Sequence, residues 1–263
     1  MMSNFDKLSK QYRNMNETIK NHRSIRKYKS TKIDKTILDE ILNAATRAST
    51  TGNMQVYSIV VTQDEKIKEE LLGAHFNQAM VTQAPIVLTF CADFNRFNKW
   101  CEINKAEPGY DNFLSFYTAS IDALLAAQNA AIEAEEQDLG ICYLGTTTYM
   151  AKKIIGILDL PKGVVPVTTI VVGYADETPD LTPRLPLKSV VHFEKYHDFD
   201  DDMIKKIYNE RENSDETKQL LKENQKETLA QIFTDNRYKK QDNIFFSNEF
   251  LKVIEEQGFM NNK

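Results

Sequence analysis

The feature that most limits how this chain can fold is a nearly continuous apolar run, Ala84-Pro85-Ile86-Val87-Leu88-Thr89-Phe90-Cys91-Ala92. A strand with one solvated face alternates between apolar and polar residues, and this run does not alternate. Its length is that of a strand rather than of a long helix. The run therefore predicts a strand that is buried on both faces of a sheet.

The segments around this strand show helical and strand patterns. Asp34 has the side chain of a helix N-cap, and apolar residues recur at helical spacing over 35–48. A long helix over 114–137 is rich in small residues and apolar over much of its circumference, which indicates a central helix or a subunit interface. The remaining elements are predicted as helices over 64–73 and up to Leu158, and as strands over 56–61, 140–146 and 164–174.

Two segments depart from these patterns. Residues 93–112 are aromatic, charged and irregular, and we expect a mobile excursion that carries part of a binding surface. The prolines within 179–186 exclude a helix there. We predict one α+β domain over residues 1–195, because no linker-like composition interrupts it. Residues 196–263 are predicted to form a helical arm that packs on this body or on a second subunit.

The composition argues against several classes of partner. The formal net charge of −5 makes a general nucleic-acid surface a poor interpretation. The first residues lack the apolar region of a signal peptide, and no run has the length of a membrane span. We therefore expect a cytoplasmic protein with no nucleic-acid or membrane partner. Cys91, Cys101 and Cys142 fit neither a disulfide framework nor a zinc site, and Cys91 and Cys142 are expected to be buried.

The sequence also lacks the common nucleotide and hydrolase motifs. It contains no GxGxxG after a strand, no GxxxxGK[ST], no HExxH and no GxSxG. Its four histidines are scattered along the chain: His22, His75, His192 and His197. We therefore expect any chemistry to come from a bound cofactor, with no metal site.

The densest cationic segment is Asn21-His22-Arg23-Ser24-Ile25-Arg26-Lys27-Tyr28. Two guanidiniums, an imidazole, a hydroxyl and an ammonium offer an array of donors that suits a dianionic phosphate. Ile25 divides the group and is expected to point inward. The alternative is a solvated charged turn between two helices.

The chain contains four separated polar loops, namely 22–26 within this cationic segment, 49–55, 77–78 and 143–146. Arg184 is a distant second guanidinium. A flavin mononucleotide needs a cationic phosphate pocket, donors and acceptors at the pyrimidine edge, a cation near N1/O2 and a backbone N–H near N5. Together these loops can supply all four.

The order of these motifs resembles the FMN-dependent nitroreductase/flavin reductase family, and in particular its longer-chain branch, which uses NADPH. The resemblance runs from about Thr18 to Tyr196. The motifs that carry it are His22-Arg23-Ser24-Ile25-Arg26-Lys27-Tyr28, Ser49-Thr50-Thr51 with Gln55, Asn77-Gln78, Cys91-Ala92-Asp93-Phe94-Asn95-Arg96, Ala127-Gln128-Asn129-Ala130, Gly140 with Tyr143-Leu144-Gly145, and Pro183-Arg184-Leu185-Pro186.

The resemblance implies an α+β fold with a mostly antiparallel central sheet flanked by helices. It also implies an intertwined homodimer with two FMN molecules at the interface, and a ping-pong exchange of hydride from NADPH or NADH to a nitroaromatic, a quinone or a free flavin. No side-chain acid or base is obligatory in that mechanism.

The resemblance also assigns roles to residues of this chain. His22, Arg23, Ser24 and Arg184 would hold the phosphate, and Arg26 would face N1/O2. Thr50 and Gln78 would contact the ribityl chain or the pyrimidine edge, from either subunit. Leu144 would lie against the ring, and the Gly145 backbone would donate to N5 as the catalytic contact. The implied flavin site further includes Ile25, Met80, Tyr143 and Thr146.

The chain departs from the branch at two motif positions. Thr182 and Thr148 stand where that branch usually has a lysine and an arginine. The loss of the lysine removes one phosphate contact. The basic loop that binds the extra phosphate of NADPH has no clear counterpart, because Arg211 lies between Glu210 and Glu212. The sequence therefore predicts weak discrimination between the two coenzymes, or a preference for NADH.

Other interpretations of the same residues stay open. Gln78 is also consistent with a helix-surface amide, Tyr143 and Leu144 with strand core, and Arg184 with a surface ion pair. Phe97 and Trp100 fit a substrate lid or a dimer contact equally well. For the whole protein, a flavin-storing or flavin-sensing protein and a flavin-free interaction module remain the alternatives to an enzyme.

Overall fold

A computed structural model describes residues 15–262 of the chain. These residues form two compact units. The first comprises the described residues up to Asp180 and those from Ser247 onward, and the second is Leu181–Phe246. The domain boundary predicted at residue 195 stays a prediction.

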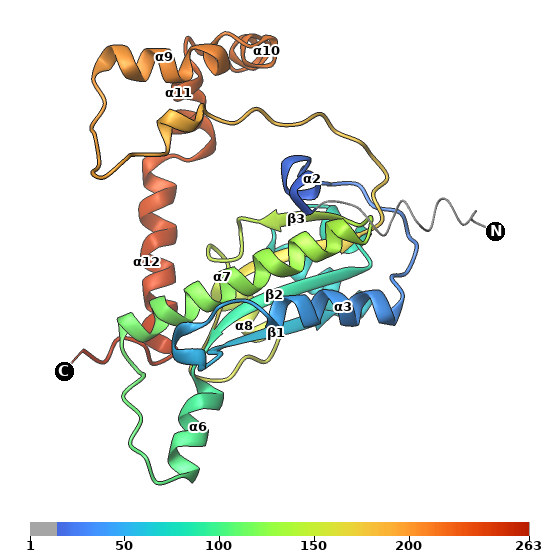
Figure 1. Ribbon diagram of the computed structural model, residues 1–263, viewed down its shortest axis with the longest axis vertical. Coiled ribbons are helices and arrows are strands. Elements are labelled where there is room, and N and C mark those ends of the chain that lie inside the picture. Colours follow the sequence, from blue (N-terminus) through green and yellow to red (C-terminus); the bar gives the residue numbers. More distant parts are fainter. Residues whose placement is uncertain (1–14, 263) are drawn as a thin grey trace. The chain divides into compact units, whose positions relative to one another are not determined.

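The first unit contains one four-stranded antiparallel sheet with helices on both faces (Figure 1). Its strand order is β1-β2-β4-β3, so that β1 and β3 are the edge strands. The strands are β1 (Tyr57–Thr62), β2 (Ile86–Asp93), β3 (Gly140–Leu144) and β4 (Val164–Gly173). The helices are α2 (Met15–Lys20), α3 (Lys35–Thr46), η1 (Thr51–Asn53), α4 (Glu65–Ala74), α5 (Met80–Gln83), α6 (Asn95–Ile103), α7 (Phe113–Glu136), α8 (Ala151–Ile157) and the second half of α12 (Lys240–Glu256).

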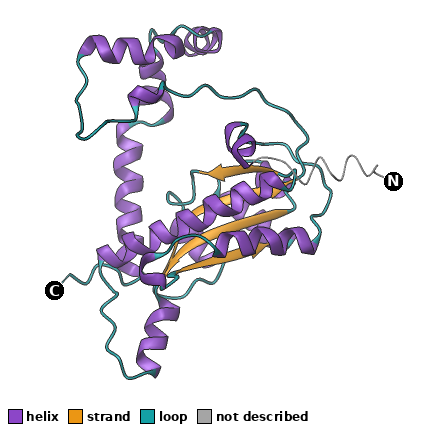
Figure 2. Ribbon diagram, viewed as in Figure 1, coloured by secondary structure: helices purple, strands orange, loops and turns teal. Residues whose placement is uncertain are grey.

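The strand β2 confirms the prediction made from its apolar run, because all eight of its residues are buried. Its side chains alternate between two clusters, as the period of two requires. Ile86, Leu88 and Phe90 belong to the cluster that contains residues of α3 and α7, whereas Val87 packs with residues of α4 and α8. The sheet is therefore the middle layer between two helical layers (Figure 2).

The long predicted helix is present as α7. Its buried face consists largely of alanines, which let the helix approach the sheet closely. The alanines of this face are Ala119, Ala123, Ala126, Ala127, Ala130, Ala131 and Ala134. The opposite face carries large apolar side chains that are exposed in a single chain: Leu114, Tyr117, Ile121, Leu124 and Leu125.

The expectation of an irregular segment over 93–112 is wrong for residues 95–103, which form α6. Phe97 and Cys101 lie one turn apart on the inner face of this helix. The ring of Phe97 is 5.4 Å from that of Tyr110, and Cys101 is buried. One short apolar face among charged residues is too weak a periodic signal to recognise in the sequence.

The second unit is helical, as predicted for the chain from Asp200 onward. Asp200, Ser214 and Thr228 each cap the N-terminus of a helix through their side chains. Its elements are η2 (Leu187–Ser189), α9 (Asp201–Glu212), α10 (Asp215–Asn224), α11 (Leu229–Gln231), the π-helix η3 (Ile232–Arg237) and the first turns of α12. Over the described residues of both units, no helix combines the length and apolarity that a bilayer span requires.

Candidate functional site

The cationic segment lies along the edge strand β3. Ser24 forms a parallel bridge with Ile141, and the Ile25 N–H donates to the Ile141 carbonyl at 2.9 Å. The side chain of Ile25 is buried, as predicted. A Cβ placed on Gly140 would come within 2.6 Å of that side chain, so a glycine is required for this close approach. The backbone of the segment is therefore fixed to the sheet.

The charged side chains of this segment have different surroundings. His22 Nδ1 lies 2.7 Å from Glu135 Oε1, and Arg23 Nη1 donates to the Pro179 carbonyl at 3.0 Å. The Arg26 side chain is exposed, and its backbone N–H donates to Glu177 Oε1 at 2.6 Å. The side chains of Arg26 and Lys27 are therefore the cations of this segment that are exposed to solvent.

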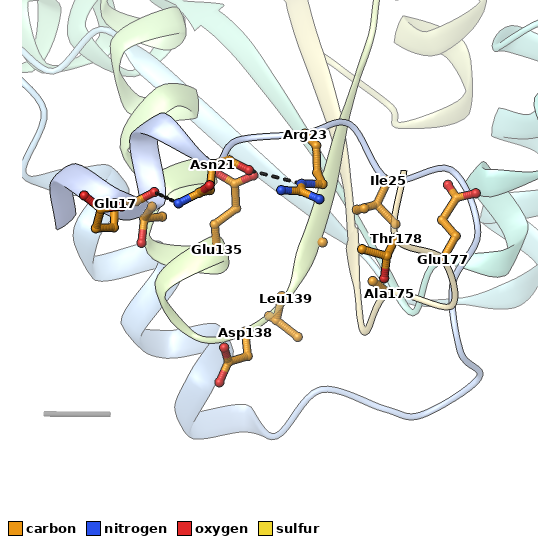
Figure 3. A pocket seen from close by; sticks show the side chains of 12 residues that line it. Glu17, Asn21, Arg23, Ile25, Glu135, Asp138, Leu139, Ala175, Glu177 and Thr178 are labelled. Atoms are coloured by element: carbon orange, nitrogen blue, oxygen red, sulfur yellow. Dashed lines mark hydrogen bonds between the residues drawn. The ribbon is translucent and has the colours of Figure 1, made fainter. Parts of the chain in front are cut away.

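A cavity of about 300 Å³ lies next to Arg23 (Figure 3). Figure 3 shows that carboxylates surround it, with the Arg23 guanidinium as the cation drawn there. Its acidic residues are Glu17, Glu135, Asp138 and Glu177. One of these carboxylates, Glu135, lies 2.7 Å from His22 Nδ1. The predicted contact of Arg23 with a phosphate stays a prediction.

The Gly145 turn follows directly after β3. Leu144 is buried in the core, whereas Gly145 is exposed. A Cβ built on Gly145 would meet no atom within 4 Å. Among the residues that the structure describes, the Gly145 N–H has no hydrogen-bond acceptor. The turn therefore offers an unpaired backbone donor beside open space.

The structure brings the predicted residues Gln78 and Thr146 together through His75. The His75 carbonyl accepts hydrogen bonds from Gln78 N at 3.2 Å and Gln78 Nε2 at 3.0 Å. Its imidazole Nδ1 lies 2.8 Å from Thr146 Oγ1. Met80, another predicted site residue, is buried at the start of α5. No motif pointed to His75, because its role depends on residues that are distant in the sequence.

The predicted ribityl contact Thr50 lies in a loop that a buried carboxylate holds. Asp122, which is 1% exposed, accepts hydrogen bonds from Thr51 N at 3.0 Å and Val56 N at 3.4 Å. Burial raises the pKa of the Asp122 carboxyl. Asn53 and Gln55 adopt positive φ angles of 54°, which non-glycine residues rarely adopt. No motif of the sequence pointed to Asp122.

Tyr143 lies between core and surface at the end of β3. Its hydroxyl donates to Gln128 Oε1 at 3.4 Å, and burial raises its pKa. Both its open interpretations, strand core and flavin contact, are consistent with this partial burial.

The comparison with known families decides the assignment of the chain. The model of the nitroreductase family matches residues 19–174, which is more than half of the 263 residues. The chain belongs to the nitroreductase family. The resemblance inferred from the scattered motifs is thereby confirmed.

Individual relatives agree with this family assignment. An FMN reductase (NADPH) from Bacillus subtilis (strain 168) is 36% identical over 189 residues, which are 71% of this chain and 76% of that protein. A crystal structure from Bacteroides fragilis NCTC 9343 has a TM-score of 0.92 at 52% identity and covers 93% of this chain and 100% of that chain. The structure of the NfrA1 nitroreductase from B. subtilis has a TM-score of 0.85 at 30% identity and covers 95% of this chain and 100% of that chain. The α+β nitroreductase-like fold predicted from the sequence is confirmed.

Arg184, the predicted second phosphate cation, belongs to the second unit of this nitroreductase-family chain. Its side chain is exposed, and Nη1 donates to the Thr182 carbonyl at 3.2 Å. Its place beside the residues of the first unit stays a prediction.

The second unit also contains a cationic cluster that no sequence motif predicted. The guanidiniums of Arg211 and Arg237 lie over the ring of Phe233, at 5.3 and 5.7 Å from its centroid. The Phe233 ring is stacked on Tyr238, with centroids 6.0 Å apart. Two exposed cations are therefore close to one aromatic pair.

Proposed function

We propose that this chain is an FMN-dependent oxidoreductase that takes hydride from NADPH or NADH and reduces a small, flat, electron-poor acceptor. Nitroaromatics, quinones and free flavins are the acceptor classes that the family resemblance implies. The membership in the nitroreductase family and the relative named FMN reductase (NADPH) support this proposal. The structural observation that carries it is the unpaired N–H of Gly145 beside open space.

The residues of the first unit fit a flavin. The Gly145 donor is exposed, and nothing occupies the space in front of its Cα, so a flat ring edge with an acceptor atom can approach. Arg26 is exposed and supplies the cation expected near N1/O2, and Ser24 lies two residues away on the same fixed backbone. The contacts proposed for His22, Arg184, Thr50 and Gln78 rest on the family resemblance.

When bound, FMN supplies a ring that accepts hydride and passes two electrons on. The part of the protein is to position that ring. The Gly145 N–H would donate to the N5 edge, and the Arg26 guanidinium would offset negative charge that builds at N1/O2 on reduction. We propose a ping-pong order, in which the coenzyme leaves before the acceptor takes its place.

The second unit contains residues that bear on the preference between NADPH and NADH. The prediction of weak discrimination was based on Arg211 between two carboxylates, whereas Arg237 adds a second guanidinium at the same ring. Two cations at one aromatic face would bind the additional phosphate that NADPH has and NADH lacks, and would therefore favour NADPH. The ratio of kcat/KM for NADPH and NADH in the wild type and in Arg237→Ala tests this, and an unchanged ratio contradicts a role for the cluster.

We also propose a homodimer. Its support is the exposed apolar face of α7, where Leu114 is 71% and Tyr117 is 55% exposed in a single chain. Light scattering of the purified protein should give twice the chain mass. Leu124→Glu with Leu125→Glu should give a monomer, because each carboxylate would be buried without a partner in the interface.

The reductase proposal is tested by the absorbance spectrum of the purified protein. It should be yellow, bleach on addition of NADPH or NADH, and recover with a nitroaromatic or quinone. A protein that stays yellow with both coenzymes is a flavin-binding storage or sensing protein instead. A colourless protein that takes up no FMN supports the flavin-free interaction module.

A further inference from the structure

His75 connects two loops through its backbone and its side chain. It is the C-cap residue of α4, and its N–H donates to the Leu71 and Leu72 carbonyls. Its carbonyl accepts both hydrogen bonds from Gln78. Its imidazole reaches Thr146, 71 residues away in the sequence, at 2.8 Å. The Gln78 loop and the Gly145 turn are therefore joined by one residue.

The imidazole is fully enclosed. His75 is 0% exposed, and its Nε2 has no hydrogen-bond partner among the described residues. Burial lowers the pKa of the imidazole to about 4, so the ring is neutral at neutral pH. A neutral ring carries one N–H, on either Nδ1 or Nε2.

The two tautomers have different consequences. With the proton on Nε2, a buried N–H would have no acceptor among the described residues, and a buried donor without an acceptor is strongly unfavourable. With the proton on Nδ1, the N–H donates to Thr146 Oγ1, and only a lone pair of Nε2 stays unpaired, which is the more tolerated defect. The Nδ1–H tautomer is therefore favoured.

In this tautomer the Thr146 oxygen is the acceptor of the imidazole N–H, and its own O–H is left to donate elsewhere. Thr146 follows Gly145, whose backbone N–H is unpaired next to open space. The Met150 N–H donates to the Thr146 carbonyl at 3.1 Å, which further fixes the residue.

We propose that His75 is a positioning residue that fixes the Gly145 turn and makes the Thr146 hydroxyl a second hydrogen-bond donor beside the Gly145 N–H. This inference rests on the proposed function, because the group that receives the two donors is the flavin ring. Two fixed donors at the edge where charge develops would favour reduction of the ring.

The test uses the FMN-loaded, full-length protein and two matched pairs of variants. His75→Leu removes the imidazole donor, and His75→Asn retains an amide N–H near the position of Nδ1. Thr146→Val removes the hydroxyl with little change of shape, and Thr146→Ser retains it. The readouts are the rate of flavin bleaching by NADPH in rapid mixing, the FMN dissociation constant and the thermal unfolding midpoint.

We expect His75→Leu and Thr146→Val each to slow bleaching about tenfold while FMN stays bound, which corresponds to the loss of about one hydrogen bond. His75→Asn and Thr146→Ser should bleach within about threefold of the wild type. The double variant His75→Leu/Thr146→Val should be no slower than either single variant, because both changes remove the same contact.

Two results would overturn the inference. One is a bleaching rate of Thr146→Val equal to that of the wild type; the other is additive slowing in the double variant. If His75→Leu unfolds, the Thr146 pair and His75→Asn still give the answer. A wild-type protein that binds FMN but is not bleached by either coenzyme would instead refute the proposed reductase function, and the positioning role with it.

Discussion

The Gly145 turn and the Arg184 segment were both predicted to contact the same cofactor, but the structure holds them in different ways. The turn follows a strand, its Leu144 side chain is buried, and Thr146 is bonded to a buried imidazole. Arg184 lies between two prolines on an exposed segment, where, within the described part of the chain, its guanidinium donates only to the Thr182 carbonyl. Core packing fixes the position of the Gly145 N–H in the absence of a ligand, whereas the exposed guanidinium of Arg184 becomes fixed only when it binds an anion. The turn should therefore govern the chemistry, and the arginines the affinity.

The largest expected effect concerns the exposed cations. Arg26→Ala with Arg184→Ala should weaken FMN binding at least about a hundredfold, because two charge-assisted contacts of about 1.5–3 kcal/mol each would be lost. The unfolding free energy should change little, since both side chains are exposed. Titration with FMN measures the effect. Lys188→Ala, which removes an exposed charge from the same segment, is the control, and an FMN dissociation constant of the double variant equal to the wild type would contradict the assignment.

The second effect concerns the buried side of the turn. The pKa of His75 is about 4 in the folded protein and about 6.5 in the unfolded chain, so the unfolded state binds more protons between these values. Stability should therefore fall by on the order of 3 kcal/mol as the pH is lowered from about 7 to 4. Urea unfolding at several pH values measures this. The unfolding free energy of His75→Asn should lack this part of the pH dependence. If the unfolding free energy varies with pH equally in this variant and the wild type, the buried imidazole is not neutral.

The third effect concerns the loop that carries Thr50. Asp122→Asn should destabilise the protein by about 1–3 kcal/mol, because an amide cannot accept hydrogen bonds from Thr51 N and Val56 N with both of its terminal atoms. The exposed Asp39→Asn, which breaks a surface ion pair with Lys35, should change stability by at most about 1 kcal/mol. Equal midpoints of thermal unfolding for the two variants would refute the anchoring role.

The smallest effect separates stability from binding at the turn itself. Gly145→Ala should stabilise the protein by about 0.4–1 kcal/mol, because the φ of Gly145 is not positive and its Cβ would meet no atom. The same methyl group would occupy the space proposed for the flavin, so FMN binding should weaken. Gly52→Ala, at a φ of 56°, should destabilise instead. If Gly145→Ala binds FMN as the wild type does, the ring does not lie against this turn.

The parts of the fold that were predictable have a strong local signal. The buried β2 was evident as an uninterrupted apolar run, and α7 as a long stretch of alanines, and both are present close to the predicted bounds. The helix α6 was not predicted, because its inner face consists of little more than Phe97 and Cys101. Short helices depend on tertiary contacts that local periodicity does not reveal.

The candidate site was predictable where motifs carried it, and not where single buried residues support it. The Gly145 turn and the inward-pointing Ile25 were predicted from motifs, whereas the bridge from Ser24 to Ile141 was not. His75 and Asp122 lie in a helix cap and a helix face, and their importance comes from partners that are 71 and 66 residues away. The different surroundings of Arg23 and Arg26 also depend on tertiary contacts, because Arg23 donates to the Pro179 carbonyl and lines the acidic cavity.

The bridge between Ser24 and Ile141 also bears on how the protein stays dispersed. The strand β3 is at the margin of the sheet, and the short stretch at Ser24 and Ile25 occupies part of its outer hydrogen-bonding edge. An uncovered strand of this kind is a template for pairing with other chains. A chain that begins after Lys29 should consequently precipitate at concentrations at which the full-length chain remains dissolved.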